Sequence, residues 1–195
     1  MTETTSAGLL VGSDGLSRCA WAGSAPEYLA YHDDEWGRPV HGETALYERF
    51  TLEAFQSGLS WITILRKREA FRAAFAGFDA ERVAEFDDGD RNRLMADVGI
   101  VRNARKVDAA ITNARAVLAL RADGGLDAYV WSFAPEHHQP PRTVADFRAR
   151  SSESVALTNG LKKRGFVFVG PTTAYAAMQA CGLVDDHLTG CFRAR

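Results

Sequence analysis

Apolar residues recur at three- and four-residue spacing along most of the chain, which predicts a fold built from amphipathic helices. The pattern is clearest over residues 42–57, where Leu46, Phe50 and Ala54 share one stripe. A single strand-like run, Phe166 to Val169, is cut short by Gly170-Pro171 and predicts an extended connector. The sequence therefore predicts an all-α fold with helices over residues 27–35, 42–57, 60–75, 80–86, 90–98, 103–122, 152–165 and 171–181.

Glycine and proline divide this helical pattern. Gly124 and Gly125 are expected to end the long helix over 103–122, and Pro140-Pro141 make Ala134 to Arg142 a loop that is a candidate boundary between two helical lobes. Residues 1–16 are small and polar and predict a flexible leader. Residues 17–195 are then expected to form one domain.

Composition narrows the class of protein. The three cysteines are too few and odd in number for a disulfide framework, and they fit a reducing cytosol. The chain has neither a signal-peptide pattern nor an apolar run that spans a bilayer, so we expect a cytoplasmic monomer without membrane contact. The formal net charge of −2 does not favour a nucleic-acid partner, although a local basic face is compatible with it.

Two pairs of metal-ligand residues lie near opposite ends of the chain. Cys19 and His32 are separated by twelve residues, and His187 and Cys191 by three. Together they make a Cys2His2 set suited to tetrahedral zinc, and with four protein ligands the zinc would be structural. The alternative is that these are ordinary buried residues. The third cysteine, Cys181, follows an apolar helical stripe and is expected in the core.

A short turn between two predicted helices resembles a helix-hairpin-helix motif. Gly99-Ile100 forms the turn, and Arg102, Arg105 and Lys106 lie at the start of the following helix. Backbone amides at such a turn, together with the positive end of the helix dipole, suit a DNA phosphate. An ordinary helix connection with a solvated basic end is the alternative.

Aromatic residues crowd the first third of the chain around one carboxylate, Glu53, which falls on or beside an apolar stripe. Glu53 either faces water at the edge of that stripe or lines a pocket. A pocket of aromatic faces and a carboxylate suits a flat, positively charged base such as a flipped, methylated purine. The aromatic residues are Trp21, Tyr28, Tyr31, Trp36, Tyr47, Phe50, Phe55 and Trp61.

Several motifs, in consistent order from Ser17 to Cys191, resemble the DNA-3-methyladenine glycosylase I (Tag) family. They include YHDDEWG, LEAFQSGLSWITILRKRE, GIVRNARK and the final H-x3-C. The resemblance implies a helix-hairpin-helix glycosylase fold with a structural zinc that joins the N- and C-terminal segments. It also implies the following roles: Cys19, His32, His187 and Cys191 as zinc ligands, Glu53 as the catalytic carboxylate that contacts the damaged base, Tyr31 and Trp61 as pocket residues, and Trp21, Tyr28 and Trp36 as nearby aromatics.

The implied activity is base-excision repair on alkylated double-stranded DNA. The enzyme would hydrolyse the N-glycosidic bond of 3-methyladenine and leave an abasic site. The family lacks the catalytic aspartate that many related glycosylases carry after the hairpin, so neither Asp123 nor Asp127 is expected to have that role. Two other classes remain open from the residues alone, a non-catalytic DNA-binding module and a small zinc-stabilised interaction domain. The aromatic cluster around Glu53 favours the enzyme, because duplex binding does not need it.

Overall fold

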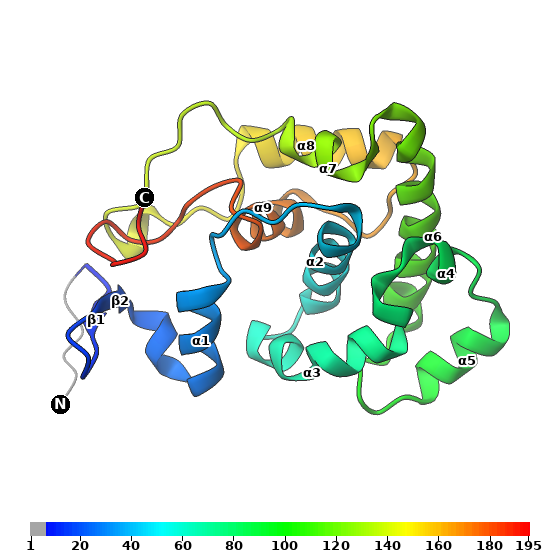
Figure 1. The fold of residues 1–195 in the computed structure, drawn as a ribbon, viewed down its shortest axis with the longest axis horizontal. Coiled ribbons are helices and arrows are strands. Elements are labelled where there is room, and N and C mark those ends of the chain that lie inside the picture. Colours follow the sequence, from blue (N-terminus) through cyan, green and yellow to red (C-terminus); the bar gives the residue numbers. More distant parts are fainter. Residues whose placement is uncertain (1–6) are drawn as a thin grey trace.

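A computed structural model describes residues 7–195 as a set of helices with one small β-hairpin at the end of the molecule that holds both termini (Figure 1). The helices and strands are, in chain order, β1 Leu9–Val11, β2 Ser17–Cys19, α1 Pro26–Asp34, α2 Glu43–Gln56, α3 Trp61–Ala74, α4 Ala80–Ala84, α5 Asp88–Ala96, α6 Ala104–Leu120, α7 Gly125–Trp131, α8 Ser152–Lys163 and α9 Pro171–Ala180. Short 3-10 turns lie at Ala20–Ser24, Ala76–Phe78, Arg121–Asp123 and Val144–Asp146. Among the described residues, no helix combines the length and apolar character needed to cross a membrane.

Helix α2 is the centre of the core. Every residue from Leu46 to Phe55 is buried, because α3, α6, α7 and α9 all pack against this helix. The apolar stripe predicted from sequence accounts for only one face of it. The polar side chains on the other faces are therefore also enclosed by protein, and Glu53 is one of them.

The helix starts largely follow the sequence. Three helices follow a residue whose side chain accepts hydrogen bonds from the amides of their first turn: Asp79, Asn103 and Ser151. Helix α5 begins at Asp88, two residues before the predicted start, and the Asp87 side chain caps it. Ser60 makes no capping bond, and the free amide of Ile62 instead donates to the Tyr28 hydroxyl oxygen at 2.8 Å.

Helix α7 is absent from the sequence prediction, which treats Gly124-Gly125 only as the end of α6. Both glycines adopt positive φ, and the chain turns there into α7. This helix fixes the segment that leads into α2. The Asp127 carboxylate accepts hydrogen bonds from His41 Nδ1 at 3.0 Å and from the Gly42 amide at 3.1 Å.

Of the segment predicted as a flexible leader, residues 7–16 belong to the described part and include strand β1, and residues 1–6 lie outside it. Strand β1 pairs antiparallel with β2, with Leu9 opposite Cys19. The three-residue strands are too short for a periodic signal, so sequence did not reveal them. The C-terminal segment joins this hairpin, since the Phe192 amide donates to the Ser17 carbonyl at 2.8 Å.

Candidate active site and metal centre

A cavity of about 280 Å³ lies where α1, α2, α3 and α9 meet. Glu53 and five of the eight aromatic residues that the sequence groups around it line this cavity, whereas the other three, Tyr47, Phe50 and Phe55, are buried in the hydrophobic core. Such a volume is close to the lower end of the roughly 300–1,000 Å³ typical of small-ligand sites. The lining residues are Trp21, Tyr28, Tyr31, Trp36, Glu53, Gln56, Trp61, Ala176 and Gln179.

The aromatic rings of the cavity pack on one another. The Trp21 ring meets Tyr28 and Trp36 edge to face, at centroid distances of 5.7 Å and 5.2 Å. Tyr31 lies 5.4 Å from Trp61 at a tilt of 46°. Edge-to-face and tilted contacts of this kind hold each ring in place, so the cavity is preformed. The Tyr28 bond to the start of α3 ties two of its walls together.

Glu53 is the one carboxylate of this cavity, and it has no hydrogen-bond or ion-pair partner among residues 7–195. Its side chain is buried, with a relative exposure of 6%. Burial raises the pKa of Glu53 to about 8, and the nearby Arg49 charge lowers it only in part. An unpaired buried carboxylate costs free energy, so the cavity is built to receive a partner for it.

Glu48 provides a comparison on the same helix. It is also buried, yet Arg72 holds its carboxylate with hydrogen bonds of 3.0 Å from Nε and 2.7 Å from Nη2. Arg49 does not do the same for Glu53: its Nη2 donates to Glu35 at 2.9 Å, and its Nη1 is buried without a hydrogen-bond partner. Helix α2 thus satisfies one of its buried glutamates and leaves the other open to the cavity.

Three residues that line the cavity were not predicted from the sequence: Gln56, Ala176 and Gln179. Two of them belong to α9, which only tertiary packing brings to the cavity. A weak signal exists, since Gln179 is polar within the apolar run AYAAMQA. Its Nε2 donates to the buried Asp186 carboxylate at 2.7 Å, so the carbonyl oxygen is the free end of this amide.

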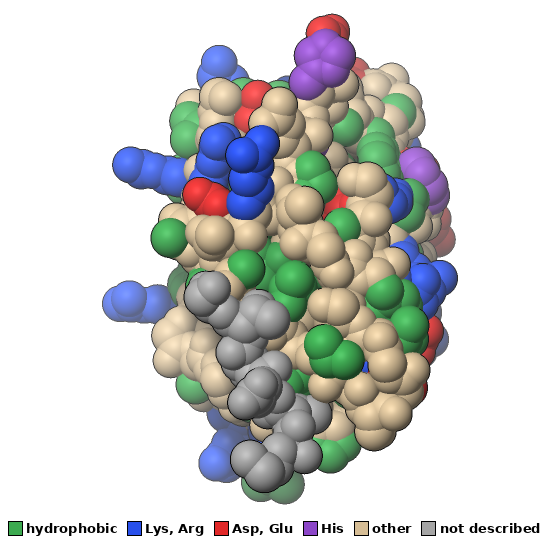
Figure 2. Space-filling model, turned by 90° about the vertical axis from the view of Figure 1, so that its left-hand side faces the viewer, with side chains coloured by type: hydrophobic (Ala, Val, Ile, Leu, Met, Phe, Trp, Pro, Cys, Tyr) green, Lys and Arg blue, Asp and Glu red, His purple; other side chains and the backbone are tan. Residues whose placement is uncertain are grey.

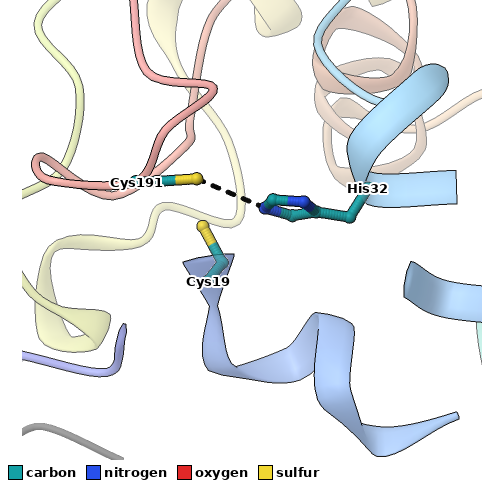
Figure 3. Close-up of side chains that lie close together, drawn as sticks. All are labelled: Cys19, His32 and Cys191. Atoms are coloured by element: carbon teal, nitrogen blue, oxygen red, sulfur yellow. Dashed lines mark hydrogen bonds between the residues drawn. The ribbon is translucent and has the colours of Figure 1, made fainter. Parts of the chain in front are cut away.

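A second cluster lies beside the cavity and joins the two ends of the chain. Cys19 from the end of β2, His32 from α1 and Cys191 from the C-terminal segment point toward one another (Figure 3). All three are buried, and their ligand atoms lie within 4.8 Å of one another. The structure therefore brings together three of the four predicted metal ligands from distant parts of the sequence.

The donor chemistry of this cluster suits a metal. A hydrogen bond from Cys19 lowers the pKa of the Cys191 thiol to about 4, which favours the thiolate form. His32 Nε2 lies 3.4 Å from Cys191 Sγ, and its Nδ1 donates to Asp33 at 2.7 Å. A carboxylate behind a histidine in this way fixes the ring orientation, as is common for metal ligands.

His187, the fourth predicted ligand, lies next to this group but is not one of the three mutually close donors. Its ring centroid is 4.8 Å from that of His32. Its Nδ1 donates to Asp185 at 2.7 Å, and its Nε2 is buried without a hydrogen-bond partner. A buried imidazole nitrogen that has no hydrogen-bond partner and lies beside two cysteines is available as a metal ligand.

The cavity and the metal cluster share a wall. Trp21 meets the His32 ring at a centroid distance of 5.2 Å, and Trp36 meets the His187 ring at 4.6 Å. Both tryptophans also line the cavity. Changes in the metal cluster therefore reach the cavity through two direct ring contacts.

The predicted hairpin is present between α5 and α6, with differences in detail. Gly99 does not offer a free amide, because its N–H donates to Asp97 at 2.7 Å, and the Ile100 side chain is buried in the core. The amides of residues 100–102 have no acceptor within the described chain. Arg102 and Arg105 are exposed and form no ion pair with residues 7–195.

The structure corrects the prediction that Lys106 contacts DNA. Its side chain is buried, and its ammonium donates to the carbonyl oxygens of Phe55 at 2.8 Å and Ser57 at 2.7 Å. The third position of α6 points toward the carboxyl end of α2, where free carbonyls attract a cation. Lys106 therefore joins the hairpin to α2 and is not free for a phosphate.

The end of the molecule that holds the termini carries Lys and Arg side chains at separate places rather than in one continuous basic patch (Figure 2). This distribution agrees with the net charge of −2.

Comparison with known proteins gives consistent matches over nearly the whole chain. The family model for methyladenine glycosylase matches residues 21–194. DNA-3-methyladenine glycosylase 1 of Escherichia coli (strain K12) is 47% identical over 181 residues, which cover 90% of this chain and 96% of the relative. DNA-3-methyladenine glycosylase of Haemophilus influenzae is 44% identical, with the same coverage of both chains.

Solved structures agree. The fold matches a crystal structure of 3-methyladenine DNA glycosylase I with a TM-score of 0.87 and 46% identity, over 91% of this chain and all of the other. It also matches 3-methyladenine DNA glycosylase I from Staphylococcus aureus, described for its recognition of 3-methyladenine, with a TM-score of 0.86 and 34% identity over 91% and 96% of the two chains. On sequence and fold together, this chain belongs to the methyladenine glycosylase family.

Proposed function

We propose that this protein is a DNA glycosylase that hydrolyses the N-glycosidic bond of 3-methyladenine in alkylated double-stranded DNA. The observation that carries the proposal is the unpaired, buried Glu53 carboxylate in a preformed aromatic cavity. Methylation at N3 gives adenine a positive charge. An opposite charge within about 4–6 Å favours the ionised carboxylate, so the cation would draw the pKa of Glu53 back down as it enters.

The same arrangement explains discrimination against normal adenine. The neutral base gains little from a carboxylate and little from the electron-rich faces of the tryptophan and tyrosine rings. Glu53 would accept a hydrogen bond from the exocyclic amine of the methylated base, while Tyr31 and Trp61 enclose its flat ring. Burying the carboxylate costs free energy in the empty protein, and a bound cation offsets this cost by pairing with its charge.

The reaction then needs little acid catalysis. The C1′–N bond breaks with both electrons going to the base, which leaves neutral because it was cationic. A water oxygen forms the new bond to C1′ and releases its proton to solvent. The protein extrudes the nucleotide, holds the base and lets DNA phosphates support the positive sugar in the transition state. No lysine nucleophile is involved, so the product is an intact strand with an abasic site.

We infer that the cluster of Cys19, His32 and Cys191, with His187 as the fourth donor, holds one structural zinc ion. The fit rests on the unpartnered Nε2 of His187 and on the low pKa of Cys191. When bound, zinc would link the β1–β2 hairpin, α1 and the C-terminal segment by four protein ligands, with no position left for water. Its contribution is to position the Trp21 and Trp36 wall of the cavity.

The hairpin between α5 and α6 is the proposed phosphate contact of a monomer bound to duplex DNA. Three backbone amides without an internal acceptor, together with the free Arg102 and Arg105, support it. A DNA-binding module without catalysis could use the same hairpin. It would have no use for a cavity that buries an unpaired carboxylate, and this favours the enzyme.

The test is release of 3-methyladenine from methylated duplex DNA, followed by chromatography of the free base. Glu53→Gln should slow release about ten- to a hundredfold, since one charged hydrogen bond contributes roughly 1.5–3 kcal/mol. Glu48→Gln is the matched control on the same helix, and its rate should stay near wild type because Glu48 pairs with Arg72 away from the cavity. A wild-type rate in Glu53→Gln, or a DNA adduct trapped by borohydride, would contradict the mechanism.

A further inference from the structure

A second hollow, of about 380 Å³, lies next to the base cavity and has no role in the mechanism above. The two are neighbours on two elements. Gln56 lines the cavity, and the adjacent Ser57 lines the hollow. On α9, Ala176 lines the cavity, and Thr173, one turn earlier, lines the hollow. The hollow is lined by Ser57, Lys162, Phe168, Val169, Gly170 and Thr173.

The connector between α8 and α9 forms one side of this hollow in an unusual conformation. Phe166 and Val169 are buried in the core, whereas Val167 and Phe168 between them are 42% and 40% exposed. Phe168 adopts a φ of 56°, in the left-handed region that disfavours a large side chain. The backbone conformation that exposes the Phe168 ring to solvent is therefore energetically unfavourable.

A buried side chain holds this conformation in place. Asn113 of α6 donates from Nδ2 to the Val167 carbonyl at 3.1 Å and accepts from the Val167 amide at 2.8 Å. Both backbone groups of Val167 are therefore fixed. Strained residues persist where surrounding bonds over-determine them, and such residues cluster at ligand contacts.

The hollow also has the charge and neighbours that suit nucleic acid. Lys162 is exposed and has no ion-pair partner within residues 7–195. The buried Lys106 ammonium lies 5.9 Å from the Phe168 ring while it holds the Ser57 carbonyl, so it connects the hollow to the hairpin. A cation beside an aromatic face is the usual combination for a nucleotide, whose base stacks on the ring while its phosphate meets the cation.

We propose that this hollow receives the nucleotide next to the flipped one, with its base or sugar against Phe168 and its phosphate toward Lys162. The inference rests on the proposed function, because it needs DNA bound with the lesion in the adjacent cavity. The Phe168 ring, presented by a strained backbone, then contributes to holding distorted DNA and not to recognition of the damaged base.

The experiment compares two kinds of binding in Phe168→Gly. Affinity for a duplex oligonucleotide that carries a tetrahydrofuran abasic analogue should fall roughly tenfold or more, as expected for loss of one base–aromatic stack. Affinity for free 3-methyladenine should not change, since the base cavity is intact. The midpoint of thermal unfolding should stay equal or rise, because glycine relieves the left-handed strain.

A matched control is Val155→Ala, which removes an exposed apolar side chain from α8 away from the hollow and should leave duplex affinity unchanged. Unchanged duplex affinity in Phe168→Gly would overturn the inference. A fall in stability together with weaker binding of the free base would also overturn it, because the ring would then be structural. If the wild-type protein neither releases nor binds 3-methyladenine, the proposed function itself fails, which is a distinguishable result.

Discussion

Helix α1 carries two adjacent residues into two different kinds of buried site. Tyr31 lines the aromatic cavity, and His32 belongs to the metal cluster. In the cavity, the Glu53 carboxylate is buried without a partner. In the metal cluster, His32 and the neighbouring His187 both have Nδ1 bonded to a carboxylate, and the ligand atoms of Cys19, His32 and Cys191 lie within 4.8 Å of one another.

The difference teaches how to separate a binding site from a structural one. A closed set of donors with satisfied outer contacts suits an ion that stays, because every ligand is already oriented. A lone buried charge suits a ligand that comes and goes, because the charge is satisfied only while the ligand is present. The two sites meet at Trp21 and Trp36, so an ion held in the cluster would support one wall of the cavity.

The largest expected effect is loss of the metal cluster. Cys191→Ala removes a thiolate donor, and we expect zinc to be lost and the protein to become less stable by roughly 3 kcal/mol or more, since metal binding is part of folding free energy. Metal content by elemental analysis and the thermal unfolding midpoint measure both effects.

Cys181→Ala is the matched control for that substitution. Cys181 is also a buried cysteine, but it lies at the end of α9 and outside the cluster of donors. We expect this variant to keep one zinc per chain and to lose only the small packing contribution of one buried atom. Equal zinc content in both variants would remove the structural distinction drawn above.

The next effect concerns the stability cost of Glu53. The folded pKa of about 8 lies above the ordinary value of 4.5, so the folded protein binds more protons than the unfolded chain between these values. Stability should therefore fall as pH rises from about 4.5 to 8. Glu53→Gln removes this dependence, and near pH 8 we expect it to be more stable than wild type by about 1–3 kcal/mol.

Denaturant unfolding of both proteins between pH 5 and 8 measures this difference. Glu48→Gln should change stability in the opposite direction, because it removes the charge of a buried carboxylate that is paired with the half-exposed Arg72. A Glu53→Gln variant that is less stable than wild type at pH 8 would mean that Glu53 is satisfied in the empty protein.

The smallest expected effects separate the free arginines of the hairpin from its buried lysine. Arg102→Ala should reduce the salt dependence of duplex binding by about one unit of slope and change stability by less than about 0.5 kcal/mol. Lys106→Met should instead lower stability by about 1–3 kcal/mol, since the Phe55 and Ser57 carbonyls lose their donor. Equal salt slopes in wild type and Arg102→Ala would exclude this arginine as a phosphate contact.

The parts of the site that depend on residue type were predictable from the sequence. Aromatic rings, one carboxylate, two cysteines and two histidines are rare enough to stand out, and the structure gathers the cavity residues as expected. Prediction from the sequence failed where tertiary packing decides the outcome. Arg102, just before α6, and Arg105, in its first turn, are exposed, whereas the adjacent Lys106 is buried, and no local pattern distinguishes them.

Other elements were beyond local patterns for the same reason. Gln179 reaches the cavity only because α9 packs against α2. The strands β1 and β2 are stabilised by each other and by the C-terminal segment, so their three-residue runs carry no periodicity. The burial of Glu53 follows from helices that surround α2 on every side, which the single apolar stripe did not indicate.

The most direct measurement is the affinity of the cavity for 3,9-dimethyladenine, a cation without a cleavable sugar, between pH 6 and pH 8, in wild type and Glu53→Gln. With a pKa of about 8 for Glu53 in the empty protein, wild-type affinity should rise by roughly tenfold per pH unit at first and then level off as the carboxylate ionises. Glu53→Gln should bind more weakly at pH 8 and show no such rise. Equal, pH-independent affinity in the two proteins would contradict the account of how this cavity selects its base.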